Sequence, residues 1–150
     1  RMFQSNYSLE IISQTDNFNS YKIEEILKVD LINDIPSYIG EVERCEIFSR
    51  VDNPINILSN KISSIIGREE PKDVVDIWVV WNNRDVDWEK IFTDVSSKAV
   101  GIFPPQVAKK LDEFPLELLE RVKWVEGQNP GEVKFEKDLE KITAEILKLD

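Results

Sequence analysis

Apolar and polar residues alternate with a period of two in the first third of the chain, which is typical of β-strands. The alternation is clear over residues 7–11 and 27–31, and a third strand is expected over 43–50. Turn-forming residues at 16–20 and 33–36 separate these segments. The short spacings favour an antiparallel or mixed sheet, because a parallel crossover needs about a dozen residues or more.

After residue 52 the apolar positions recur every three or four residues, which is typical of amphipathic helices. Prolines and the capping residue Asp87 stand where first turns are expected. The predicted helices span residues 54–66, 71–83, 88–95, 104–111 and 132–149, with a further turn or two at 115–119. The sequence therefore predicts an α+β fold, a small antiparallel or mixed sheet followed by a helical region packed on it.

The sheet portion (1–52) and the helical portion (53–150) are expected to form one compact unit. A three-stranded sheet is only marginally stable by itself, so it needs another layer against which to bury its apolar face. Both portions together, 150 residues, fit the size of one domain or part of one.

Composition excludes several classes of function. The chain has no histidine, so Ser-His-Asp and Cys-His catalysis and His-ligated metal centres within it are excluded. Cys45 is the single cysteine, which excludes an intrachain disulfide and a zinc-thiolate cluster. The net charge of −10 argues against a general nucleic-acid coat. Without an apolar run of about 20 residues or a signal peptide, a cytoplasmic protein with no membrane contact is expected.

Two aspartates and a lysine of the helical region suggest chemistry. Asp73 and Asp76 are three residues apart, so both carboxylates share one face of a helix. Lys61 lies on the flank of the preceding helix, where its ammonium can reach the edge of the core. A lysine near carboxylates suits a triphosphate site, because the lysine neutralises phosphate charge while carboxylates hold Mg²⁺ or orient a base.

The same residues also have a purely structural interpretation. An acidic residue in a first helical turn, such as Asp73, stabilises the helix through its dipole. Asp76 could pair with Lys72 one turn away. Asp30, beside Lys28 on the polar face of a strand, could be an ordinary solvated charge. Spacing alone leaves both interpretations open.

Tryptophans and the C-terminal charges are interpreted as structural. Trp78, Trp81 and Trp88 could stack on a base, but their place on the apolar stripes favours the core. The Glu- and Lys-rich last helix is interpreted as a solvated helix face.

Three segments, residues 28–34, 56–63 and 68–78, together resemble the AbiEii-type nucleotidyltransferase family, which contains abortive-infection toxins. That family has a strand with a lysine, a hydrophobic residue and an aspartate, then a helix with a leucine followed by a lysine. After a proline comes a helix with a basic residue and two aspartates. The matching positions here are Asp30, Lys61, Lys72, Asp73 and Asp76.

The resemblance implies a polymerase-β-like fold that transfers a nucleoside monophosphate from a Mg²⁺-bound nucleoside triphosphate to an RNA or protein acceptor. By this analogy Asp30 is a metal-binding carboxylate, Lys61 contacts the triphosphate, and Asp73 and Asp76 form the floor of the catalytic site. Lys72, also a nucleotide contact, stands where the family usually has arginine. An antitoxin partner is implied as well.

One element of the family pattern is missing. A glycine-rich turn followed by paired aspartates should precede the Asp30 strand, but all five glycines follow it. We therefore expect the C-terminal part of a nucleotidyltransferase, inactive alone. The alternative is a non-catalytic acidic interaction module, such as an immunity or antitoxin-like protein, whose charge would steer it to a basic partner.

Overall fold

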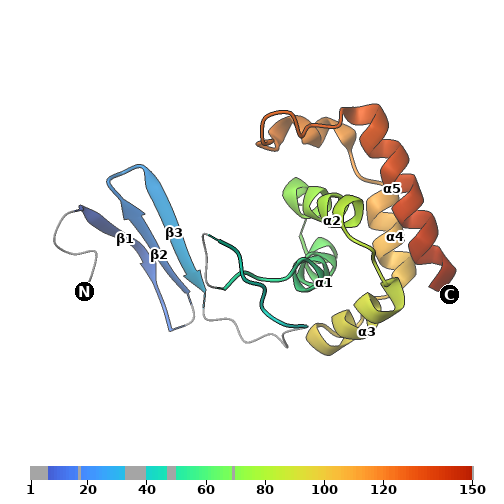
Figure 1. The fold of residues 1–150 in the computed structure, drawn as a ribbon, viewed down its shortest axis with the longest axis horizontal. Helices are drawn as coiled ribbons and strands as arrows, with labels where there is room; N and C mark the ends of the chain where they lie inside the picture. Colours follow the sequence, from blue (N-terminus) through green and yellow to red (C-terminus); the bar gives the residue numbers. More distant parts are fainter. Residues whose placement is uncertain (1–6, 17, 33–39, 47–49, 69, 150) are drawn as a thin grey trace. The chain divides into compact units, whose positions relative to one another are not determined.

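The computed structural model describes residues 7–16, 18–32, 40–46, 50–68 and 70–149. It confirms the α+β fold, with a three-stranded antiparallel sheet followed by helices (Figure 1). The chain divides into two compact units, Arg1–Pro36 and Ser37–Asp150, and not after residue 52. Packing of the two on one core stays a prediction.

The sheet unit is an antiparallel meander in the order β1-β2-β3. Its strands are β1 (Leu9–Gln14), β2 (Phe18–Ile23) and β3 (Leu27–Ile32). The register places Tyr21 between Ile11 and Val29, and residues that lie opposite one another share a face of the sheet. One face is therefore mainly apolar, and its members are Leu9, Ile11, Tyr21, Ile23, Leu27, Val29 and Leu31.

Two sequence-based expectations about strands are wrong. Residues 18–20, expected in a turn, begin the central strand β2, because pairing on both sides overrides the turn preference of Asn19 and Ser20. The expected strand over 43–50 is absent from its described residues, where Glu43 makes an isolated antiparallel bridge to Val51. Residues 47–49 and the expected loop at 33–36 lie outside the described residues.

The helices of the helical unit agree closely with those that the spacing of apolar residues predicts. The elements of this unit are α1 (Pro54–Ile65), α2 (Pro71–Asn83), α3 (Trp88–Lys98), α4 (Pro104–Asp112), the 3₁₀ helices η1 (Leu116–Arg121) and η2 (Leu147–Leu149), and α5 (Glu132–Ile146). Asp87 caps α3 as expected, accepting a hydrogen bond from the Lys90 backbone N–H. No helix in the described part of the chain has the length and apolarity of a membrane span.

The core of the helical unit is centred on α5. Phe135 is fully buried, and its ring lies 5.5 Å from that of Trp78 and 6.0 Å from that of Phe114. Trp78 and Trp88 are buried, and Trp81 packs partly buried against the same cluster. The tryptophans are therefore core residues, as the stripes predicted.

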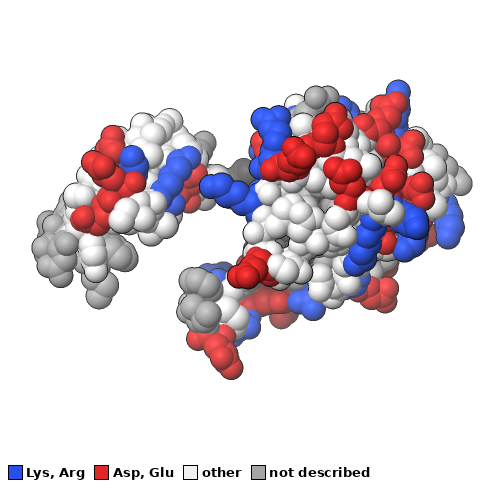
Figure 2. Space-filling model, turned by 90° about the horizontal axis from the view of Figure 1, so that it is seen from above, with Lys and Arg blue, Asp and Glu red and all other residues white. Residues whose placement is uncertain are grey.

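Two carboxylates of α5 hold tryptophan side chains. Asp138, 4% exposed, accepts from the Trp78 indole N–H, and Glu145 accepts from the indoles of both Trp81 and Trp88 at 2.9 Å. The interpretation of α5 as a merely solvated face is wrong at these two positions. On the face of the helical unit that Figure 2 shows, acidic and basic side chains are interspersed.

Candidate functional site

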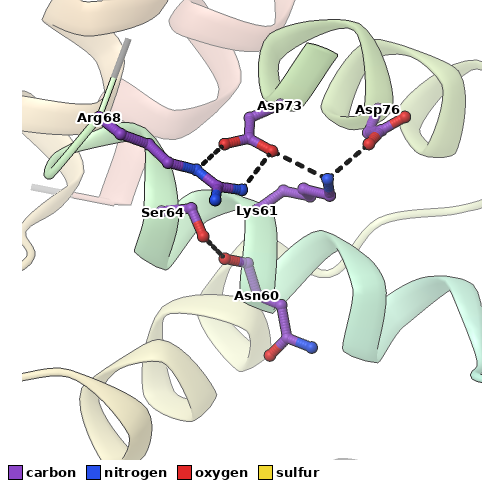
Figure 3. A network of polar contacts seen from close by, with 6 residues as sticks. All are labelled: Asn60, Lys61, Ser64, Arg68, Asp73 and Asp76. Carbon is purple, nitrogen blue, oxygen red and sulfur yellow. Dashed lines mark hydrogen bonds and ion pairs between the residues drawn. The ribbon is translucent and has the colours of Figure 1, made fainter. Parts of the chain in front are cut away.

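The candidate site lies at the seam between α1 and α2, which pack side by side. Burial of the apolar stripe of α1 leaves Lys61 at this seam, 22% exposed. Its ammonium lies 2.8 Å from Asp73 Oδ1 and 2.6 Å from Asp76 Oδ2, both on α2 (Figure 3). The structure thus brings together three of the residues that the resemblance assigns to the site, Lys61, Asp73 and Asp76.

Arg68 completes the network, and sequence reasoning assigned it no role. From the link between the helices, its Nε donates to Asp73 Oδ2 at 2.7 Å and its Nη2 donates to Oδ1 at 3.0 Å. Together with Lys61, it gives the Asp73 carboxylate three charge-assisted hydrogen bonds. Asp73 is only 1% exposed, so these bonds replace its hydration.

The network shifts the pKa values of Asp73 and Lys61. Burial by itself would raise the pKa of Asp73, but hydrogen bonds from Arg68 and Lys61 hold it below its usual range. Burial would likewise lower the pKa of Lys61, but the bonds to Asp73 and Asp76 raise it. These directions keep the Asp73 carboxylate and the Lys61 ammonium charged at neutral pH.

The structural interpretation of the aspartates is partly correct. Asp73 does lie in the first turn of α2, but its carboxylate is engaged with Arg68 and Lys61. Asp76 pairs with Lys61 across the seam, and no ion pair joins it to Lys72 among the described residues.

Asp30 belongs to the sheet unit. It accepts a hydrogen bond from the Ser20 hydroxyl and pairs with Lys28 at 3.1 Å. The bond from Ser20 and the contact with Lys28 lower its pKa. Lys61 belongs to the other unit, and the convergence of Asp30 with Lys61 stays a prediction.

The residues of the seam do not by themselves fit a divalent cation. Among the described residues, no group of three or more His, Cys, Asp or Glu side chains could hold a metal ion. Asp73 already accepts three hydrogen bonds from cationic side chains, which leaves little capacity for a metal. Metal binding by Asp30 therefore stays a prediction from the resemblance.

Acid is expected to destabilise the protein in part through Asp73. Because its folded pKa is depressed, its contribution to stability is present above the unfolded-state pKa and is lost as pH falls through the folded value. Urea unfolding between about pH 5 and pH 2 should show a smaller loss of stability for Asp73→Asn than for wild type. Some acid sensitivity should remain, because the pKa of Asp138 is lowered too. An equally reduced pH dependence in the control Asp112→Asn, at an exposed position, would contradict the assignment.

Comparisons of the chain with protein-family models, with curated proteins and with solved structures found no match.

Proposed function

We propose that this chain carries the triphosphate-binding part of a nucleotidyltransferase similar to the AbiEii type, and that Lys61 holds the phosphates. The observation that carries the proposal is the position of the Lys61 ammonium between Asp73 and Asp76. These are the lysine and the two aspartates that the resemblance assigns to the catalytic site, and they come from two different helices.

The chemistry of the seam supports this role. In nucleotidyl transfer an acceptor oxygen bonds to the α-phosphorus, the bond to the β-phosphate oxygen breaks, and pyrophosphate leaves with the added negative charge. An ammonium group at that point stabilises the charge. Lys61 is accessible enough to exchange a carboxylate for a phosphate oxygen, while Arg68 keeps the buried Asp73 neutralised during the exchange.

The remaining parts of the proposal come from the resemblance. Mg²⁺ would arrive with the triphosphate, with Asp30 as its expected ligand, and Lys72 would be a further contact to the nucleotide. The acceptor would be an RNA or a protein, an antitoxin would be the partner, and the location would be the cytoplasm. The chain alone would not complete the transfer, since the sequence given lacks the glycine-rich turn with paired aspartates.

A non-catalytic interaction module is the second candidate. The observation that favours it is that Asp73 accepts three hydrogen bonds from Arg68 and Lys61. A purely structural ion-pair network has the same arrangement. Under this alternative the seam would bind no nucleotide, and the acidic surface would meet a basic partner.

Calorimetric titration with the four common nucleoside triphosphates and Mg²⁺ separates the two candidates. We expect at least one triphosphate to bind the wild-type chain, and Lys61→Met to weaken its binding about 10- to 150-fold, because a hydrogen bond to a charged group contributes about 1.5–3 kcal/mol. The matched control is Lys137→Met, at an exposed position of α5.

Two results would count against nucleotide binding at the seam. Wild-type protein that binds none of the triphosphates at millimolar concentration would favour the interaction module. Equal affinity of Lys61→Met and Lys137→Met would place any bound nucleotide elsewhere. Circular dichroism of both variants checks that the helices remain folded.

A further inference from the structure

A groove of about 670 Å³ lies between α2 and residues 121–128, which begin at the last residue of η1, within the helical unit. One wall is a single face of α2, formed by residues spaced three, one and three apart, namely Lys72, Val75, Asp76 and Val79. The opposite wall is formed by residues 121–123, 125 and 128. In Figure 1 this second wall belongs to the orange stretch beside α2.

The groove gathers cations that have no carboxylate partner in the described part of the chain. Lys72, Arg121 and Lys123 line it, and none of the three forms an ion pair with a described residue. On a chain with a net charge of −10, three such cations in one groove stand out. They are free to bind carboxylates or phosphates of another molecule.

Both walls of the groove suit an extended peptide. Four valines, Val75, Val79, Val122 and Val125, supply aliphatic surface. Val122 has the extended backbone of a strand. The backbone N–H and C=O groups of Lys123 and Trp124 have no backbone partner among the described residues. An incoming strand could therefore pair with them, which is a common mode of peptide recognition.

We propose that this groove binds an extended acidic segment of a partner protein. Its backbone pairs with Lys123 and Trp124, its aliphatic side chains lie on the valines, and its carboxylates meet Arg121, Lys123 and Lys72. The groove shares Lys72 and Asp76 with the proposed nucleotide site. The proposal does not rest on nucleotidyl transfer, because Arg121 and Lys123, which the test replaces, lie outside that site.

The lining favours a peptide over a nucleic acid. The side chains that line the groove include no aromatic ring, so bases have no surface on which to stack. Glu70 and Asp76 also line it and would repel a continuous phosphate backbone. A peptide can place its carboxylates at the cationic positions alone.

Fluorescence anisotropy with a labelled peptide that alternates glutamate and valine tests the proposal on the full chain. We expect this peptide to bind the wild-type protein, and Arg121→Gln/Lys123→Gln to weaken binding about tenfold or more, because two charge-assisted bonds are lost. The matched control is Lys137→Gln/Lys148→Gln, which removes the same charge from exposed positions outside the groove. A peptide alternating glutamine and valine should bind far more weakly.

Three outcomes would overturn the proposal. The first is no binding of the acidic peptide at millimolar concentration. The second is an equal loss of affinity in the groove variant and the control variant, which would show a non-specific effect of net charge. The third is tighter binding of a labelled oligouridylate, lost in the groove variant, which would make the groove a nucleic-acid site.

Discussion

Replacing Phe135 by alanine is expected to lower the free energy of unfolding of the helical unit by about 3–5 kcal/mol. The side chain is fully buried, and the rings of Trp78, Phe114 and Trp124 surround it. Three rigid aromatic neighbours cannot collapse fully into the space that the phenyl ring leaves, so a cavity remains. Urea unfolding followed by circular dichroism measures the change.

Val133→Ala on the same helix is the matched control. Val133 is 67% exposed, so its truncation should change stability by no more than about 0.5 kcal/mol. Phe135→Leu, which retains part of the buried volume, should fall between the two. A cost below about 1 kcal/mol for Phe135→Ala would contradict the central position of this ring.

Replacing Glu145 by alanine is expected to cost about 2–4 kcal/mol, although the residue stands in a helix that is rich in exposed charges. A single oxygen of Glu145 accepts both indole N–H groups, so its loss leaves two donors of the core without partners. Each unsatisfied buried donor costs about 1–3 kcal/mol. The midpoint and slope of urea unfolding give the change.

Glu140→Ala, at an exposed position of the same helix, should have almost no effect and serves as the control. Glu145→Gln should recover part of the loss, because its amide oxygen still accepts a hydrogen bond. If Trp88→Phe is already present, Glu145→Ala should cost less than in the wild type. Strictly additive costs would mean that the bond between Glu145 and Trp88 contributes nothing.

The helices could be predicted because their ends and their faces are both encoded locally. Prolines mark the starts of α1, α2 and α4, and the apolar stripes show which face each helix buries. Those faces also place Lys61, Asp73 and Asp76 at one seam, which is why this part of the site could be predicted.

The rest of the site and of the sheet depends on partners that periodicity does not reveal. Strand β2 is held by neighbours on both sides, although Asn19 and Ser20 favour turns. Arg68 lies in a link outside any helix, so no periodicity indicates where its side chain points. Glu145 has the sequence signature of a surface charge, and only the approach of α2 and α3 gives it donors.

The placement of the aromatic residues gives the two units different optical signals. Of the four tryptophans, Trp78, Trp81, Trp88 and Trp124, every one belongs to the unit Ser37–Asp150. Tryptophan emission therefore follows the melting of the helical unit. The sheet unit has no tryptophan, and its only fluorescent side chains of the Trp and Tyr type are Tyr7 and Tyr21. Emission and circular dichroism recorded in one thermal scan thus separate cooperative unfolding of the whole chain from independent melting of its two units.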